Sequence, residues 1–577
     1  MPEPRPAIII AAHGMQWTCV PEFAAVLPLL DIERSRHPDA LPPEEFVKDN
    51  TVRTVMRMHD PLRPDGPGLY LKRYKFRDAA ERLKHLLLPA KPVVEWRASR
   101  VLRGAGIPTC EVLAIAVRRQ GLLPREGFLV SREIAGTVGL TTFLRRSLPD
   151  LDRENPAYRH ELIEELAALT AALADRGFCH RDYHAGNLLI RPDARAGERL
   201  FVVDQHSFRR RRPWRSGVPR MLAMLGISVP RASTSDEDRT EFLGAFLSCW
   251  KGGPGASDRA RASLCRKEKR TELALRRRNA RSRTRRCIVR SSLFTMERTA
   301  GFLVHRRRDF PLQAALGAVR LHRAAMAGNP GIAKVLRRGH RTEVTLCRCD
   351  AVPPLEASKP APPERLRSAE VCVKSFLRAS AATRLKDLFL RLKGRARTVW
   401  IASHGFQVRG APAARPLALL ESRSKHAGMP DYMVMEALEN DGSLATLAAQ
   451  RLPAGAERRE LGKAVADLLG LLAREEVYHP DTKPSNVLVQ RAGDGFRLWL
   501  VDLDRATFGR PLTRQQWQKC LARLNAGLSA QVSVLDRMRC LRECSRGRWT
   551  PAERLRIARA VYRLSLARGP VWLASAR

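Results

Sequence analysis

Residues 161–190 read ELIEELAALTAALADRGFCHRDYHAGNLLI, and residues 460–489 read ELGKAVADLLGLLAREEVYHPDTKPSNVLV. The two stretches align without a gap at an offset of 299 residues, the separation of Asp182 from Asp481. In both, apolar residues recur at helical spacing before a His-x-Asp loop. They are Leu162, Leu166, Leu169 and Leu173 in the first stretch, and Leu461, Val465, Leu468 and Leu472 in the second. Each stretch predicts a helix, a polar loop and a short strand, and the pair indicates an internal repeat.

The repeat continues downstream in two apolar strands that contain an aspartate near the end of the apolar run. They are FVVDQHSF at 201–208, with Asp204, and WLVDLDRATF at 499–508, with Asp502. The loop aspartate precedes the strand aspartate by 22 residues in the first half and by 21 in the second. The two halves therefore keep nearly the same spacing.

Upstream, each half carries an alternating strand with a central lysine. LYLKRYK surrounds Lys72 and VCVKSFL surrounds Lys374. A Trp lies twelve residues before a Pro in both of the segments that follow, EWRASRVLRGAGIPTCEVLA and VWIASHGFQVRGAPAARPLA. This order of features predicts a tandem duplication with its join near 325–340, where AMAGNPG supplies breakers. We therefore predict a first domain over 1–330 and a second over 331–577.

In both halves the loop places an aspartate five residues before an asparagine. HRDYHAGN contains Asp182 and Asn187, and HPDTKPSN contains Asp481 and Asn486. In phosphoryl transfer such an aspartate orients an acceptor hydroxyl and can accept its proton, while the asparagine holds a metal ion. A lone His-x-Asp loop is more often a turn in which the aspartate caps a helix. The hypothesis therefore depends on the repetition of several motifs in a fixed order.

The strand aspartates Asp204 and Asp502 are placed to chelate a Mg²⁺ ion that bridges nucleotide phosphates. A lysine on an early strand can neutralise the α and β phosphates, and Lys72 has an acidic partner for this role in Glu95. Lys374 occupies the same place in the second half. A lone lysine of this kind is usually a solvated edge residue. The ordered set, found twice, favours a kinase-like phosphotransferase.

The second half departs from the first around its lysine and its loop. Val399 stands where the first half has Glu95, so Lys374 lacks the expected partner. Lys483 follows Asp481 by two residues, where a lysine can steady a transferring phosphate. The second half keeps a base and metal ligands, and we expect it to be weaker, differently specific, or a binding pseudokinase.

Two features depart from the protein kinases. Neither lysine is preceded by a GxGxxG loop, although DPLRPDGPGLY at 60–70 offers glycines in a turn, so we expect a shorter or different phosphate lid. Neither strand aspartate is followed by Phe–Gly. We interpret His180 and His479 as structural residues that shape the loop, because an aspartate stands next to each as a better base.

The sequence resembles the lipopolysaccharide core kinases, the Kdo/WaaP heptose kinase type within the protein-kinase-like fold. The resemblance rests on LYLKRY, EWRASRVLRGAGIPT, HRDYHAGNLLI and VVDQHSF. It covers about residues 45–250, and more loosely about 335–510. It implies an α+β chain of two tandem bilobal units, each with a small β-rich N-lobe, one key helix and a mainly helical C-lobe.

The resemblance also implies an activity: ATP- and Mg²⁺-dependent phosphorylation of a sugar hydroxyl of a glycolipid, the lipopolysaccharide core. It makes Asp182 the catalytic base, Asn187 and Asp204 the metal ligands, and Lys72 with Glu95 the group that binds the phosphates. The corresponding residues of the second unit are Asp481 as base, Lys374 and Lys483 as phosphate ligands, and Asn486 and Asp502 as metal ligands.

The chain is strongly basic: 103 Lys and Arg less 59 Asp and Glu gives +44. Such a charge indicates contact with polyanions, or an arginine-rich composition without a specific partner, since the basic residues are spread along the chain. A basic insertion is expected over 251–310, and its segment 267–290 either binds anionic lipid or is a solvated helix. Its few aromatic residues argue against nucleic acid. RRRRPW at 209–214 is the better candidate for acceptor binding.

Length and hydropathy limit the number of domains and the location of the protein that we expect. The 577 residues predict two or three domains. No run approaches the roughly 20 apolar residues of a membrane helix, and the first residues lack the pattern of an export signal. We therefore expect a cytoplasmic protein with peripheral contact at the inner face of the inner membrane.

Other functions fit parts of the pattern. A kinase for a small molecule such as an aminoglycoside-like compound predicts an acidic acceptor cleft, which RRRRPW opposes. A protein kinase predicts an APE-like segment, which follows neither strand aspartate. A pseudokinase scaffold that binds polyanions predicts that nucleotide turnover is dispensable, and the complete set in the first half opposes it.

Overall fold

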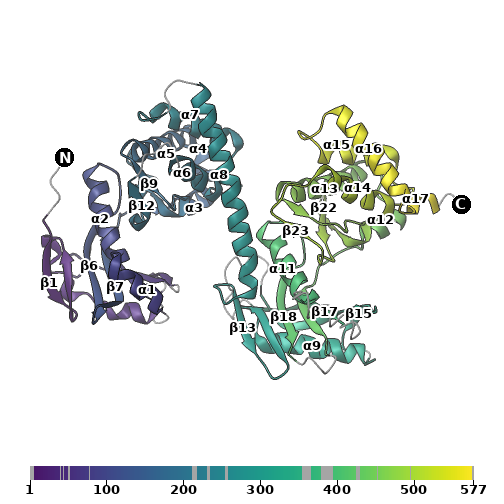
Figure 1. Ribbon diagram of the computed structural model, residues 1–577, viewed down its shortest axis with the longest axis horizontal. Helices are drawn as coiled ribbons and strands as arrows, with labels where there is room; N and C mark the ends of the chain where they lie inside the picture. Colours follow the sequence, from purple (N-terminus) through teal and green to yellow (C-terminus); the bar gives the residue numbers. More distant parts are fainter. Residues whose placement is uncertain are drawn as a thin grey trace. The chain divides into compact units, whose positions relative to one another are not determined.

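The computed structural model describes most of the chain. The described residues are 6–38, 41–42, 44–49, 52–76, 78–210, 217–230, 234–253, 258–329, 331–353, 366–377, 394–423, 429–450, 452–493 and 495–574. The chain forms two compact units, Met1–Arg276 and Arg277–Arg577. Each has a sheet lobe and a helical lobe (Figure 1). The predicted pair of α+β bilobal units is confirmed.

Seven antiparallel strands form the sheet of the first unit, in the order β1-β2-β6-β7-β5-β4-β3. They are β1 (Ile8–Ala12), β2 (Met15–Cys19), β3 (Phe46–Asp49), β4 (Arg53–Met58), β5 (Leu69–Lys75), β6 (Val112–Gln120) and β7 (Leu123–Arg132). Alternation along β5 buries Leu69 and Leu71 with Phe128 in the core on one face. It turns Lys72 to the other face, toward helix α2 (Lys91–Gly104), which α1 (Ala79–Leu87) precedes.

The second lobe of the first unit is mainly helical. Its helices are α3 (Leu140–Arg146), α4 (Leu148–Glu154), α5 (Ala157–Asp175), α6 (Val218–Ser228) and α7 (Asp236–Cys249), and its short strands are β8 (Val138–Gly139), β9 (Phe178–His180), β10 (Leu188–Ile190), β11 (Leu200–Val202) and β12 (Phe208–Arg210). Helix α5 is the helix predicted from leucine spacing, and Leu162, Leu169 and Leu173 are buried in the lobe's core. Strand β9 leads from α5 into the His-x-Asp loop, and β10 pairs with β11.

The sheet of the second unit repeats the first, in the order β13-β14-β18-β19-β17-β16-β15. Its strands are β13 (Phe294–Arg298), β14 (Phe302–Arg307), β15 (Lys334–Arg337), β16 (Thr342–Val352), β17 (Arg367–Phe376), β18 (Pro416–Ser422) and β19 (Asp431–Glu436), and helix α11 (Arg395–Val408) corresponds to α2. The lysine strand is third from the same edge in both sheets. The duplication therefore extends to strand order.

The division between the units lies earlier than the predicted join. Strand β14 pairs with both β13 and β18, so both strands belong to the second sheet. Helix α9 (Leu312–Met326) packs Ala315, Ala318 and Val319 into the core of that sheet. The breakers near 325–340 form a connection from α9 to β15 inside the second unit. Of the predicted insertion, 258–284 is helix α8 (Asp258–Thr284), and the part from 294 onward is sheet.

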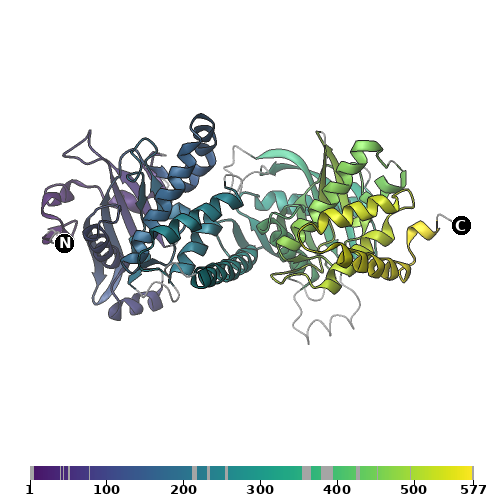
Figure 2. The same cartoon turned by 90° about the horizontal axis from the view of Figure 1, so that it is seen from above.

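The second lobe of the second unit is also mainly helical. Its helices are α12 (Leu444–Gln450), α13 (Gly455–Arg474), α14 (Arg514–Gly527), α15 (Val534–Cys544), α16 (Pro551–Leu566) and α17 (Val571–Ala574), with short strands β20 (Val477–Tyr478), β21 (Val487–Ala492), β22 (Gly495–Leu500) and β23 (Thr507–Phe508). The yellow helices of the C-terminal part pack side by side (Figures 1 and 2). Thr513 and Thr550 begin α14 and α16 with capping boxes. These helices complete the second lobe of the unit.

Candidate functional site

The loop after β9 carries the predicted base of the first unit. The buried His180 links two parts of the site: its Nδ1 accepts the backbone N–H of Asp182 at 3.1 Å, and its Nε2 donates to the backbone carbonyl of Asp204 at 3.2 Å. Burial lowers the pKa of His180 to about 4, so the ring is neutral. Asn187 steadies the loop by donating its Nδ2–H to the Asp182 carbonyl at 3.0 Å. His180 therefore positions the loop.

The carboxylate of Asp182 is exposed on one side, at 53% of its full accessibility. Nε2 of His184 lies 3.6 Å from its Oδ2. Since Nδ1 of His184 accepts the N–H of Gly186 at 3.0 Å, the proton of the neutral ring is on Nε2, facing Asp182. His184 lowers the pKa of Asp182, although burial opposes the effect. Asp182 is thus an ionised, accessible carboxylate, as a base requires.

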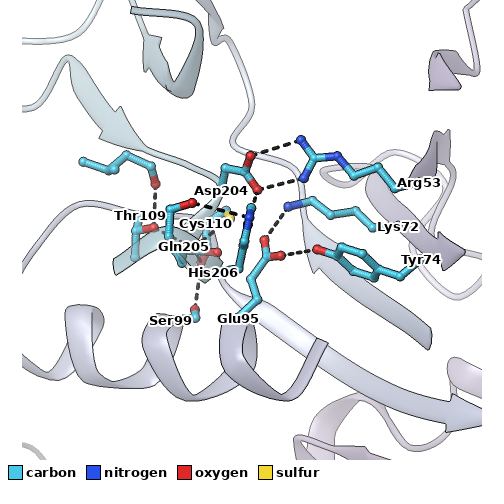
Figure 3. Close-up of polar contacts among 12 residues, drawn as sticks. Arg53, Lys72, Tyr74, Glu95, Ser99, Thr109, Cys110, Asp204, Gln205 and His206 are labelled. Atoms are coloured by element: carbon cyan, nitrogen blue, oxygen red, sulfur yellow. Dashed lines mark hydrogen bonds and ion pairs between the residues drawn. The ribbon is translucent and has the colours of Figure 1, made fainter. Parts of the chain in front are cut away.

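Asp204 follows β11 in a left-handed backbone conformation, with φ of 64°. Non-glycine residues rarely adopt this conformation, and it is concentrated at functional sites. Arg53 on β4 donates two hydrogen bonds to the carboxylate, at 2.8 and 3.0 Å, and Nδ1 of His206 lies 2.8 Å from Oδ1 (Figure 3). Burial alone raises the pKa of Asp204, but His206 and Arg53 hold it far below its usual range. The carboxylate is therefore permanently charged.

Lys72 on β5 and Glu95 on α2 form a buried ion pair (Figure 3). Burial opposes the charge of Lys72, but Glu95 raises the pKa of the amine. Tyr74, two residues along the same strand face, donates its hydroxyl to the other oxygen of Glu95. Burial and the charge of Glu95 raise the pKa of Tyr74 well above its usual value, so the hydroxyl keeps its proton. The structure thus brings the predicted pair together and adds Tyr74 as a partner.

A second set of hydrogen bonds supports the strand aspartate from behind. Nε2 of Gln205 donates to Oγ1 of Thr109 at 2.6 Å and to the carbonyl of Cys110 at 3.0 Å (Figure 3). Ser99 on α2 donates to the same carbonyl at 3.0 Å. These hydrogen bonds connect helix α2, the segment before β6 and the segment after β11.

Among the described residues, one group of ionisable side chains could hold a metal ion: Glu95, Asp204 and His206, whose ligand atoms lie within 4.8 Å of one another. Both carboxylates have protein partners: Glu95 binds a lysine and a tyrosine, and Asp204 binds Arg53 and His206. The nitrogen of Asn187 donates to the loop, which leaves its amide oxygen as the atom for a cation. Carboxylate and amide oxygens are suited to Mg²⁺, so these residues fit that ion.

The second unit arranges the equivalent lysine differently. Nζ of Lys374 lies 3.0 Å from Oδ1 of Asp502, the strand aspartate itself. Val399, which replaces the acidic partner, is buried in the apolar core beside Trp400. Asp502 has the same left-handed backbone as its counterpart, with φ of 60°. The backbone of the site is therefore repeated, but the ion pair between the strand lysine and a glutamate is not.

The base of the second unit is held by cations. Oδ1 of Asp481 accepts from Nη1 of Arg523 on α14 at 2.9 Å, and Nζ of Lys483 lies 3.4 Å from Oδ2. Asn486 donates its Nδ2–H to the same Oδ2 at 2.9 Å. The predicted loop residues Asp481, Lys483 and Asn486 are therefore in contact, but the carboxylate of Asp481 already has three partners.

Tyr74, Arg53 and Arg523 are among the residues of these sites that were not predicted from the sequence. Tyr74 and Arg53 could have been found from strand alternation, because Tyr74 shares a strand face with Lys72 and Arg53 pairs with Tyr74 across the sheet. Arg523 comes from a helix about forty residues after the loop, and no local pattern indicates it. The predicted acceptor segment RRRRPW falls mostly outside the described residues.

The basic segment 267–290 is largely part of helix α8. In the first unit its acidic residues Glu268 and Glu272 bind Arg239 of α7. This contact anchors one side of the helix, so part of the segment is structural. No helix among the described residues is both long and apolar enough to cross a membrane.

The fold and the site define a protein-kinase-like chain. In each unit a sheet lobe supplies a lysine, and a helical lobe supplies a His-x-Asp loop with an asparagine five residues on. In each unit the strand aspartate has a left-handed backbone. The same arrangement, built twice from one strand order, is that of a tandem pair.

The chain belongs to the lipopolysaccharide kinase (Kdo/WaaP) family, which matches residues 50–246 and 378–556. Two separate matches fit the tandem duplication. The lipopolysaccharide core heptose(I) kinase WaaP of Pseudomonas aeruginosa is 28% identical over 196 residues, which cover 32% of this chain and 70% of the relative. A solved structure of WaaP in complex with acyl carrier protein is 23% identical and covers 45% of this chain and 99% of that chain, with a TM-score of 0.33.

Proposed function

We propose that the chain is an ATP- and Mg²⁺-dependent kinase that phosphorylates a sugar hydroxyl of a glycolipid of the lipopolysaccharide core type. The first unit is its main catalytic site. The observation that carries this proposal is that hydrogen bonds join Asp182, Asn187 and Asp204, and that the Lys72–Glu95 pair lies beside Asp204. Membership of the kinase family supports the reaction class.

Each residue of the first unit has a chemical task. Asp182 accepts the proton of the acceptor hydroxyl, because it is ionised and exposed. Asp204 and Asn187 would hold Mg²⁺, which neutralises phosphate charge when bound. Lys72, held straight by Glu95, binds phosphate oxygens. His180 fixes the distance between base and metal ligands through its two ring nitrogens.

The second unit is proposed to act mainly by binding a ligand and to contribute little catalysis. Its Lys374 contacts Asp502 directly, and cations hold Asp481. Turnover there requires both carboxylates to exchange these partners for a metal ion and an acceptor hydroxyl. A nucleotide- or glycolipid-binding pseudokinase is therefore the favoured role for this unit.

The acceptor proposal also draws on charge. A phosphorylated glycolipid is a polyanion, and a net charge of +44 favours its approach and peripheral contact with an anionic membrane from the cytoplasmic side. The relative from Pseudomonas aeruginosa is a core heptose kinase, which supports a sugar acceptor.

The test is ATP consumption by purified wild type, Asp182→Asn and Asp481→Asn, with Mg²⁺ and with or without a lipopolysaccharide-core acceptor. We expect acceptor-stimulated turnover that falls by roughly 10²- to 10⁴-fold in Asp182→Asn, because the base is lost. Asp481→Asn is the matched control and should retain most turnover. Turnover that neither change affects would sink the assignment in favour of a polyanion-binding scaffold.

A further inference from the structure

The β3–β4 hairpin of the first unit lies beside the lysine strand, at the place where protein kinases carry a glycine-rich loop over the phosphates. The hairpin contains no glycine, since none occurs over residues 41–65. The glycines of DPLRPDGPGLY lie instead in the connection from β4 to β5, where the N–H of Gly68 donates to Glu133 at 2.9 Å. The hairpin therefore needs another means of holding phosphate.

Strand register brings cations of the hairpin to the face that carries Lys72. Lys48 on β3 pairs with Val55 on β4, and Val55 pairs with Lys72 on β5. Residues paired directly across antiparallel strands point to the same face. Arg53 lies two residues before Val55 and shares that face as well. Three cationic side chains from three adjacent strands thus share one face of the sheet.

Arg53 already contacts the candidate metal site through Asp204. Arg53 is largely buried and uses two guanidinium N–H groups on the two carboxylate oxygens of Asp204. Binding of a metal ion by Asp204 takes up at least one of these oxygens, and the guanidinium then needs a new acceptor. A phosphate has the oxygen geometry that matches the guanidinium fork.

Lys48 is more exposed and faces the same group of charges. Burial, followed by the neighbouring Arg53, lowers the pKa of Lys48, and Asp204, Asp182 and Lys72 also act on it. Its amine is therefore within electrostatic reach of the base, the metal ligand and the lysine of the site. Asp49, next to it, accepts hydrogen bonds from Thr54 and Lys75, both at 2.6 Å, which ties the hairpin to β5.

The second unit repeats one of these cations at the same register. Arg337 on β15 pairs with Val344, and Val344 pairs with Lys374. Although burial opposes the effect, Lys374 above all lowers the pKa of Asp502, with smaller contributions from Arg395 and Arg337. The position of Lys48 therefore carries a cation beside the strand aspartate in both units.

The position of Arg53 is not repeated. Arg53 pairs with Tyr74, and the corresponding pair in the second unit is Thr342 with Phe376. At these two positions the second unit thus has one cation, Arg337, where the first has two. The more complete site is also the one with both cations.

We propose that Lys48 and Arg53 bind the phosphate groups of the nucleotide, so that two cationic side chains on the β3–β4 hairpin replace the backbone N–H groups of a glycine-rich loop. The proposal rests on the proposed kinase function and adds the residues that recognise the triphosphate. It makes affinity depend on the number of phosphates, because the hairpin contacts phosphate and not the nucleoside.

The experiment measures calorimetric binding of Mg-ATP, Mg-ADP and adenosine to the full chain with Lys374→Met, which weakens the second unit so that binding reports the first. We expect Lys48→Met and Arg53→Met each to weaken Mg-ATP binding by roughly tenfold or more, as lost charge-assisted contacts do. The loss for Mg-ADP should be smaller, and adenosine should bind as before. Lys48→Arg keeps the charge and should retain most of the affinity for Mg-ATP.

Lys84→Met is the matched control, since Lys84 is an exposed lysine of helix α1, outside the sheet, and should leave the nucleotide series unchanged. Equal losses for ATP and adenosine would mean that the residues only support the fold, and would overturn the inference. Variants that bind ATP as wild type does would overturn it as well, while leaving the kinase proposal intact. A wild-type chain that binds neither nucleotide would overturn both. Lys48 is exposed on its strand, so its variants test the inference even where Arg53→Met fails to fold.

Discussion

The two units share a backbone but differ in the polar side chains behind the site. In the first, Glu95 links Lys72 to Tyr74. In the second, the same positions are the buried Val399 and Phe376, and Lys374 turns to the strand aspartate.

The network behind the strand aspartate changes in the same way. Gln205 and Thr109, which are joined by a hydrogen bond, correspond to the buried Leu503 and Ala413. Replacing a whole buried polar network by apolar residues costs little stability, whereas losing one member leaves an unpaired group. The second unit has exchanged Gln205 and Thr109 together, although Ser403 keeps the serine that corresponds to Ser99.

The largest expected effect comes from giving the first unit one residue of the second. Glu95→Val leaves the ammonium of Lys72 buried without its partner, so we expect the first unit to lose about 3–5 kcal/mol of unfolding free energy. Native-state hydrogen exchange of β5 and α2 measures the loss. Val399→Ala, at the equivalent position, should leave exchange in the first unit unchanged. A loss below about 1 kcal/mol contradicts the importance given to the pair.

The next effect is on turnover. Asp204→Asn removes a charge that faces the metal and the phosphates, and we expect turnover to fall by roughly 10²- to 10³-fold, as for other lost electrostatic contacts in active sites. Asp502→Asn is the matched change in the second unit and should reduce turnover much less. Steady-state ATP hydrolysis with acceptor checks both. Equal losses would show that the two units contribute alike.

Tyr74 and Phe376 occupy the same position on the two lysine strands, and replacing either with the residue of the other unit should destabilise its own unit. Tyr74→Phe removes a hydrogen bond to a buried carboxylate and should cost about 1.5–3 kcal/mol. Phe376→Tyr places a hydroxyl in the apolar core beside Val399 and should cost about 1–3 kcal/mol. Calorimetric unfolding of each variant against wild type measures the change. A stabilising Phe376→Tyr would mean that the second unit retains a polar partner there.

The smallest expected effect is a shift with pH. His184 lowers the pKa of Asp182 below its usual value of 3.8, so the base is ionised above that pH and is lost as pH falls through the lowered pKa. His184→Gln should raise this pKa and move the acid limb of kcat/KM upward by about one unit or less. The pH–rate profile measures it. An acid limb that moves downward would show that His184 destabilises the carboxylate.

The helix, loop and strand aspartates could be predicted because their signals are local. Helical spacing identifies α5, and the count from the loop aspartate to the strand aspartate identifies the second motif. The start of the second unit could not be found in the same way. Phe294 of β13 corresponds to Ile8 of β1 at an offset of 286 (294 less 8), whereas the loop repeats at 299. The offset is still 289 at the hairpin, from Lys48 to Arg337, and becomes 302 at the lysine strand, from Lys72 to Lys374. The change arises between β16 and β17, where the paired residues Val344 and Lys374 are 30 positions apart, against 17 for Val55 and Lys72, so the edge strands fall out of step with the repeat.

The side chains that distinguish the sites were partly predictable. Lys72 and Glu95 follow the order of a known motif, and Val399 shows its loss. The partner that Lys374 takes instead cannot be inferred from order, because it depends on which carboxylate lies within reach across the sheet. The hydrogen bond from Arg523 to Asp481 likewise depends on how α14 packs against the loop.

Helix α8 belongs to both halves of the chain, since the division between Arg276 and Arg277 falls inside it. Its earlier turns are bound to the first unit through Glu268 and Glu272, and in the second unit Arg277 binds Glu476. A protease or a truncation that separates the halves at this boundary must therefore break a helix that has ion pairs in each unit. During synthesis, the last helix of the first half is completed only as the second half emerges. Removal of the second half therefore also shortens the last helix of the first.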